Sequence, residues 1–164
     1  MKRKEEQYKR GILIFLALFC VLFLCVWQFF KWYELRCFPY AYDADLIVEK
    51  DFEFNIDNVS LTQGGVEITG WLLKKGHEPK EIEEYVLLKE VDGNQCIKIP
   101  TQIILRDDLN NNQDEVDYSL CGFYALATYK NIDINKDYEI CMLYETDGEN
   151  CIVPLNTTTK RWEK

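Results

Sequence analysis

Four oxygen-bearing side chains alternate along one polar stretch of the sequence: they are Asp108, Asn110, Asn112 and Asp114. Alternating carboxylates and amides have the spacing of a calcium-binding loop, because hard cations prefer oxygen ligands. The pattern then breaks, since Gln113 stands where such a loop needs glycine and Ser119 where it needs a bidentate glutamate. We therefore predict a solvated loop with Asx turns and no metal site, with calcium binding as the alternative.

A second set of residues, Trp71, Arg106 and Asp107, has the chemistry of a sugar-binding platform. An aromatic ring can stack on the apolar face of a sugar, and an Arg/Asp pair can hold its hydroxyl groups. The alternative is structural: a tryptophan in a β-sandwich is commonly a core residue, and an Arg–Asp pair at a strand end commonly braces a loop. These three residues are the predicted ligand-binding site.

The residue types needed for catalysis are not arranged for it. His77 is the only histidine and lies in a charged loop, so no Ser or Cys has an evident base partner. Carboxylates are numerous, but no pair stands out for acid–base chemistry. We predict a non-enzymatic protein without a cofactor; an uncharacterised hydrolase is the least favoured alternative.

Residues 11–30 form an uncharged apolar run of 20 residues that must lie in a membrane or a core. At about 1.5 Å per helical residue the run is about 30 Å long, enough to cross a bilayer. Five basic residues precede it, and only Lys31 and Arg36 follow within fifteen positions. Basic residues stay on the cytoplasmic side, so we predict a single-pass protein with its N-terminus inside and its C-terminal part outside. Trp27, Trp32 and Tyr33 fit the aromatic belt of such a span.

The alternatives to an uncleaved anchor are a cleaved signal peptide, a lipoprotein signal and a buried core helix. A signal peptide has a shorter apolar core and small residues before its cleavage site, whereas W-Q-F-F-K-W-Y follows here. Phe19 and Leu24 precede Cys20 and Cys25, where lipoprotein processing needs small residues. A core helix is disfavoured because the rest of the chain reads as strands with their own core.

The charge and the cysteines describe the exterior part of the chain. The whole chain carries −9 and its first ten residues carry +3, which leaves −12 for the remainder. An acidic exterior argues against nucleic acid as a partner. Outside the apolar run lie five cysteines, Cys37, Cys96, Cys121, Cys141 and Cys151, an odd number without a C-x-x-C pair. We interpret most of them as small buried hydrophobes, and the sequence leaves their redox state open.

After residue 50 the apolar residues recur with period two. Strands are predicted at 52–56, 66–72, 85–91, 97–105, 118–128, 138–144 and 151–156. Their alternation and turn signals predict a seven-stranded antiparallel Ig-like β-sandwich. If Asp147-Gly148 is a two-residue turn, Met142 opposes Val153 and Tyr144 opposes Cys151, so Cys141 and Cys151 point to opposite faces. Trp71 has the opposite parity from Val66 and Ile68 and faces outward, unless a bulge at Gly70 turns it inward.

The predicted organisation has five parts. They are a basic cytoplasmic tail (1–10), a transmembrane helix (11–33), a tether (34–49), an extracytoplasmic sandwich (50–157) and a frayed polar tail (158–164).

Five short motifs then carry a resemblance. They are V-E-I-T-G-W-L-L-K-K-G, E-Y-V-L-L-K, I-L-R-D-D-L, D-Y-S-L-C-G-F-Y-A-L and D-Y-E-I-C-M-L-Y. In their order and spacing they resemble a small β-sandwich accessory module of bacterial surface and membrane proteins, associated with surface-polysaccharide assembly. The resemblance covers about residues 50–156; Cys121 stands where the module has serine, and Asp107-Asp108 replaces its Pro-Asp step. It implies fold and location and brings no activity with it.

Two functions are therefore expected first. One is a non-catalytic binding or accessory module of the cell envelope that recognises a glycan or docks on a membrane protein. The other is a structural subunit that assembles through its anchor and an exposed sheet edge. An exposed aromatic groove favours the first, and an unprotected apolar edge strand favours the second.

Overall fold

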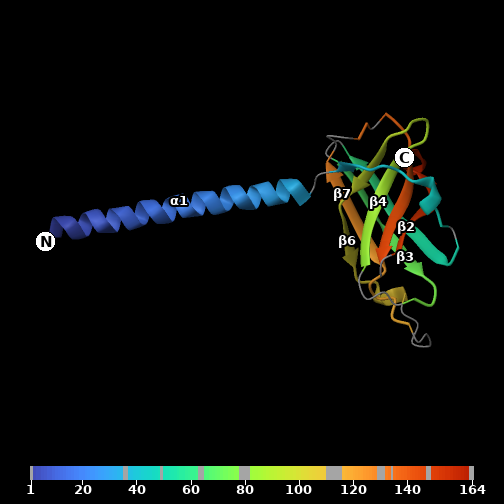
Figure 1. The fold of residues 1–164 in the computed structure, drawn as a ribbon, viewed down its shortest axis with the longest axis horizontal. Helices are drawn as coiled ribbons and strands as arrows, with labels where there is room; N and C mark the ends of the chain where they lie inside the picture. The colour runs from blue at the N-terminus through green and yellow to red at the C-terminus, as the bar shows by residue number, and fades with distance from the viewer. Residues whose placement is uncertain are drawn as a thin grey trace. The chain divides into compact units, whose positions relative to one another are not determined.

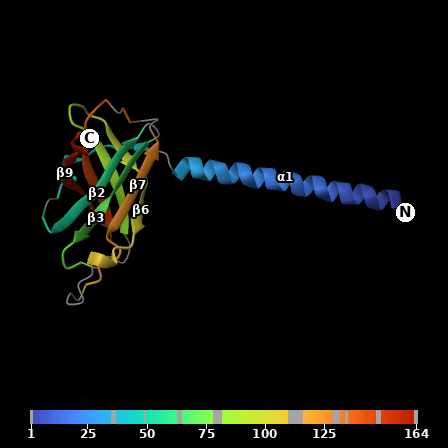
Figure 2. The same cartoon turned by 180° about the vertical axis from the view of Figure 1, so that it is seen from behind.

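The computed structural model describes residues 2–34, 37–48, 50–62, 65–77, 82–109, 116–128, 132–133, 135–146 and 149–162. The chain divides into two compact units, Met1–Glu34 and Leu35–Lys164. The first unit is one helix and the second consists mainly of strands (Figures 1 and 2).

The helix α1 spans Lys2–Glu34, so it begins nine residues before the predicted span at residue 11. Its first turns consist mostly of Lys, Arg, Glu and Gln, which are good helix formers. Within it, Arg10–Lys31 is long and apolar enough to cross a membrane, by length and composition. Large apolar side chains such as Leu13 and Phe15 are exposed all along this stretch, as expected of a helix without a protein core around it. A signal sequence near an N-terminus can meet the same criterion of length and hydropathy.

The second unit has two antiparallel sheets, ordered β1-β5-β4-β8-β9 and β2-β3-β7-β6. The strands are β1 (Phe38–Pro39), β2 (Phe52–Thr62), β3 (Gly65–Lys74), β4 (Ile82–Glu90), β5 (Cys96–Ile99), β6 (Thr101–Ile104), β7 (Gly122–Thr128), β8 (Tyr138–Thr146) and β9 (Glu149–Thr158). Short 3₁₀ turns are η1 (Ala44–Leu46), η2 (Asp107–Leu109) and η3 (Thr159–Trp162). Apolar residues from both sheets form one core between the layers, which confirms the predicted antiparallel β architecture.

The described chain has nine strands where seven were predicted. One addition is β1, and the other arises because the predicted strand 97–105 divides at Pro100 into β5 and β6, which belong to opposite sheets. Proline has no N–H for a sheet ladder, so pairing is interrupted there. The hydroxyl of Thr101 bridges the crossing: it accepts from Val86 N at 2.9 Å and donates to Ile99 O at 3.0 Å.

Replacing Thr101 by valine is expected to destabilise the fold by about 1–3 kcal/mol, because the buried N–H of Val86 loses its acceptor. Urea denaturation of the full chain in detergent measures this change. Thr101→Ser retains the hydroxyl and is the matched control, expected to stay within about 1 kcal/mol of the wild type. Equal stabilities of the valine and serine variants would contradict the bridging role.

The segment predicted as a tether packs on the five-stranded sheet. Tyr40 N donates to Cys96 O and Val48 N donates to Ile152 O, both at 2.9 Å. Tyr40, Tyr42 and Leu46 cover a second apolar cluster on the outer face of that sheet, formed by Leu87, Cys96, Cys141, Leu143 and Ile152. The alternating apolar residues of β4 and β8 are therefore buried on both faces. The part of the predicted tether from Cys37 to Val48 thus packs on the sandwich.

The predicted polar tail is also docked where the structure describes it. Thr159 is buried, and its Oγ1 accepts a hydrogen bond from Tyr138 N at 3.1 Å. Lys160 N donates to Asp137 Oδ1 at 3.1 Å. These contacts hold η3 against the start of β8, while residues 163–164 lie outside the described residues.

The last hairpin confirms the predicted register. Met142 pairs with Val153 and Tyr144 with Cys151. Cys141 lies in the outer apolar cluster, whereas Cys151 packs against the core between the sheets. The two side chains therefore lie on opposite faces of the sheet, as predicted.

Most of the predicted buried cysteines are buried: Cys37, Cys96, Cys121 and Cys141. Burial raises the pKa of Cys96 to about 11 and that of Cys141 to about 12. These thiols stay protonated at neutral pH and are poor nucleophiles, so they act as small apolar residues.

Candidate functional site

Trp71 lies on the outer face of the four-stranded sheet, as predicted. Burial alternates without interruption along β3, with Val66, Ile68 and Leu72 inside and Trp71 half-buried on the other face. The bulge is on the neighbouring strand: Ile56 pairs with Gly70 and Asn58 with Thr69, which leaves Asp57 as the extra residue. Gly70 itself makes room on the inner face, where an added Cβ would lie 2.8 Å from the ring of Phe123.

Arg106 is anchored where β6 runs into η2. Its backbone N–H donates to Ser119 O at 2.8 Å, and its carbonyl accepts from Leu109 N at 3.1 Å. Its aliphatic stem passes over β7, since a Cβ on Gly122 would lie 2.6 Å from Arg106 Cγ. Gly122 is the direct partner of Trp71 in the pairing of β3 with β7, so the space above Gly122 lies on the same face of the sheet as the Trp71 side chain. The register therefore brings Trp71 and Arg106 into neighbouring positions, as the platform prediction requires.

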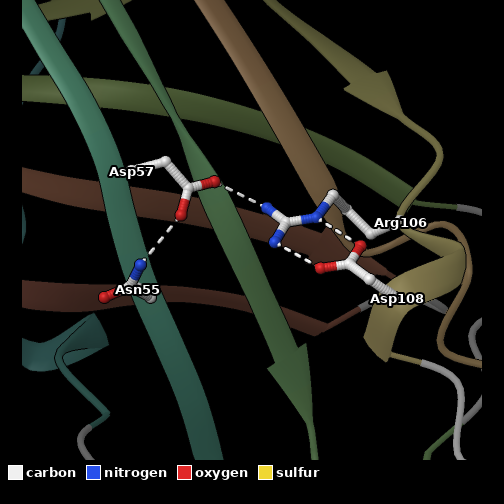
Figure 3. A network of polar contacts seen from close by, with 4 residues as sticks. All are labelled: Asn55, Asp57, Arg106 and Asp108. Carbon is white, nitrogen blue, oxygen red and sulfur yellow. Dashed lines mark hydrogen bonds and ion pairs between the residues drawn. The ribbon is translucent and has the colours of Figure 1, made fainter.

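The Arg106 guanidinium binds two carboxylates (Figure 3). Nε and Nη2 donate to the two oxygens of Asp108 at 2.8 and 2.9 Å, and Nη1 donates to Asp57 Oδ2 at 2.6 Å. Asn55 Nδ2 donates to the other oxygen of Asp57 at 2.8 Å, which completes the network. These bonds from Arg106 lower the pKa of Asp108 and hold it ionised. The network spans the outer face of the sheet from β2 to η2.

The carboxylate that pairs with Arg106 is Asp108 rather than the predicted Asp107. Asp107 is exposed on the first position of η2. The second carboxylate, Asp57, comes from a strand about fifty positions earlier; it follows the inward-facing Ile56 and so lies on this face, where the bulge makes it the extra residue of β2. Neighbouring positions add Tyr124, which is half-buried and pairs with both Thr69 and Gln102. The result is a polar face that carries two aromatic rings.

The calcium pattern divides between described and undescribed residues. Asp108 is committed to Arg106, whereas Asn110, Asn112 and Asp114 lie outside the described residues. Among the residues that the structure describes, no group of three or more His, Cys, Asp and Glu side chains could hold a metal ion.

A pocket that sequence reasoning missed lies between the ends of the two sheets. It is a cavity of about 70 Å³ that borders β3, β4, β8 and residues 117–121. The residues that line it include Leu72, Leu73 and Tyr144, together with polar residues such as Lys74 and Ser119.

Glu84 is the unusual group of this pocket. Its side chain is 3% exposed, and neither carboxyl oxygen has a hydrogen-bond partner among the described residues. Burial raises the pKa of Glu84 to about 8, so the neutral acid predominates at pH 7. Glu84 has the same parity as Val86 and Leu88, both in the core. That parity was the available signal, but the predicted strand began one residue later, at 85.

Comparison of the chain with protein-family models, with curated proteins and with solved structures finds no match.

Proposed function

We propose that this protein is a single-pass membrane protein that displays one Ig-like module outside the cytoplasm. The apolar stretch Arg10–Lys31 supports the anchor by its length and composition. The five basic residues before this stretch support a cytoplasmic N-terminus.

The strand order supports the Ig-like type. In an Ig domain the strands A-B-E-D form one sheet and C-F-G the other. When β2, β3, β4, β6, β7, β8 and β9 are lettered A to G in chain order, the sheet β2-β3-β7-β6 corresponds to A-B-E-D and the strands β4-β8-β9 correspond to C-F-G. The strand β5 lies beside β4 as an additional strand. At Pro100 the chain passes from β5 in the five-stranded sheet to β6 in the four-stranded sheet, which corresponds to the step that precedes strand D of an Ig domain.

The module is proposed to bind a glycan on the outer face of the four-stranded sheet, in keeping with a role in surface-polysaccharide assembly. The observation that carries this proposal is the half-buried Trp71 beside the Arg106 network. The indole offers a stacking surface, and the guanidinium has five N–H donors, of which three are used by Asp57 and Asp108. Remaining donors and carboxylate lone pairs are available to sugar hydroxyls in a preorganised geometry.

Trp71→Ala is expected to reduce glycan retention at least about tenfold, because the stacking surface is lost. The measurement is binding of the full chain in detergent to a glycan array that includes bacterial surface polysaccharides. Trp71→Phe keeps an aromatic face and is the matched control, expected to retain most of the binding. Unchanged retention by a folded Trp71→Ala variant would overturn the proposal.

A structural subunit is the second candidate, favoured by the free edge of β6. This strand ends the four-stranded sheet, and Ile103, Ile104 and Leu105 expose apolar surface along it. An exposed edge can pair with a strand of another chain. If this candidate is correct, Trp71→Ala leaves the proteins that co-purify from membranes unchanged, whereas Ile104→Lys reduces their recovery.

A further inference from the structure

The pocket at Glu84 is distinct from the face that carries Trp71, and it contains an acid without a hydrogen-bond partner among the described residues. A buried carboxyl group without hydrogen bonds is costly, so folded proteins normally satisfy such groups. Both oxygens of Glu84 are buried, and Glu84 is one of the residues that line the cavity. A ligand that enters this cavity can supply the missing interaction.

We propose that this pocket binds a primary ammonium group carried on an unbranched aliphatic chain, with the ammonium paired to the carboxylate of Glu84. The charge of the site selects a cation, because an ionised Glu84 repels anions and attracts an N–H donor with a positive charge. The net charge of −12 outside the first ten residues raises the local concentration of cations in addition.

The shape of the pocket selects the chain that carries the charge. A cavity of about 70 Å³ is small, so we infer that the chain it takes is short, and n-butylammonium is the probe chosen for it. Leu72, Leu73 and Tyr144 provide apolar walls for the methylene groups. Burial of an aliphatic chain against such walls is favourable, because its methylene groups leave water.

Several other groups face the pocket and contribute to its charge. Lys74 at the end of β3 and His77 after it are basic, and Asp117 before β7 is acidic. Tyr118, Cys121 and Tyr144 are the other titratable residues that line the cavity among the described residues. The hydroxyl of Tyr118 accepts a hydrogen bond from Gly76 N at 2.8 Å, which ties the loop after β3 to the pocket.

Binding and ionisation are linked, and this gives the proposal a specific signature. Glu84 must release its proton before it pairs with an ammonium group, whereas the amine remains charged throughout. Apparent affinity is therefore expected to rise about tenfold per pH unit between pH 6 and pH 8.

The experiment titrates the full chain in detergent with n-butylammonium and follows the ¹³C resonance of the Glu84 carboxyl carbon. Saturable binding is expected with the tenfold rise per pH unit, while n-butanol and butyrate bind at least tenfold more weakly at pH 8. Nα-acetyl-lysine methylamide and putrescine then distinguish a lysine side chain from a free polyamine as the source of the amine.

Glu84→Gln is expected to lose at least 90% of the affinity for n-butylammonium, measured through the backbone amide resonances of the pocket. The matched control is Glu139→Gln, because Glu139 lies on β8 and forms an ion pair with Lys89 of β4. This variant also loses a carboxylate and is expected to bind n-butylammonium as the wild type does. Retained binding by Glu84→Gln, or equal binding of n-butanol without pH dependence, would overturn the proposal. If Glu84→Gln does not fold, the pH dependence and the butanol comparison on the wild type decide.

Discussion

The stability of this protein is expected to fall by about 1.4 kcal/mol for each pH unit between pH 5 and pH 8, and Glu84→Gln is expected to abolish most of this slope. Burial raises the pKa of Glu84 to about 8 in the folded chain, against 4.5 for the exposed group. In that window the folded state keeps a proton that the unfolded state releases, so raising the pH favours unfolding. The stabilisation is complete below pH 4.5 and is lost as the pH passes 8; its full size is on the order of 5 kcal/mol.

Urea denaturation of the full chain at several pH values, followed by near-ultraviolet circular dichroism, measures this dependence. At pH 5 the wild type and Glu84→Gln are expected to be similarly stable, because both side chains are neutral there. At pH 8.5 the variant is expected to be more stable by several kcal/mol, since it buries no charge. His77→Gln is the control for the histidine that also lines the pocket, and this variant should keep the slope. A slope of the same size in Glu84→Gln would show that another group carries it.

Gly70→Ala is expected to destabilise the sandwich by about 3 kcal/mol or more through steric overlap with the neighbouring strand. The added Cβ would collide with the backbone carbonyl of Asn55 and would lie 2.8 Å from the ring of Phe123 and 3.1 Å from Ile56 Cα. Two of these three atoms belong to the backbone of β2, which cannot move without disturbing its pairing with β3. Phe123 is fully buried, so its ring has no free space to enter.

Gly122→Ala is the matched comparison for this effect. Its Cβ would also approach neighbouring atoms within 2.7 Å, but two of the three belong to the side chains of Arg106 and Ile104, and both residues are partly exposed. The third atom is the backbone carbonyl oxygen of Ile104 at 2.7 Å, so Gly122→Ala is also expected to be destabilising and to disturb the Arg106 network. The loss of stability is expected to be smaller than for Gly70→Ala, because the nearest atom belongs to a partly exposed side chain and no fully buried ring is displaced. Chemical denaturation of both variants measures the difference. A Gly70→Ala variant within about 1 kcal/mol of the wild type would contradict the close packing of β2, β3 and Phe123.

Much of the architecture could be read from local patterns. Period-two alternation predicted the antiparallel strands, and the two-residue turn predicted the pairing of Tyr144 with Cys151. The outward position of Trp71 followed from its parity relative to Val66 and Ile68. Such predictions succeed because adjacent residues of a strand must face opposite sides of the sheet.

Other features depend on residues that are distant in the chain. Asp57, the extra residue of β2, pairs with Arg106 from about fifty positions away, and no pattern in either segment indicated that pairing. Tyr40 and Tyr42 cover the outer face of β4 and β8, strands that begin about forty or more positions later in the chain. Pro100 lies within the predicted strand 97–105, but its consequence, a change of sheet, depends on which strands lie on each side.

The sequence by itself determined an apolar helix long enough to cross a membrane, an antiparallel β domain, and an outward Trp71. These depend on hydropathy and periodicity, which are properties of neighbouring residues. Only the tertiary structure decided that Asp57 and Asp108 bind Arg106, that residues 37–48 pack on the sheet, and that Glu84 lies buried beside a cavity. The physical reason is that burial and charge pairing are set by whichever distant element covers a side chain, and a local pattern does not contain that element.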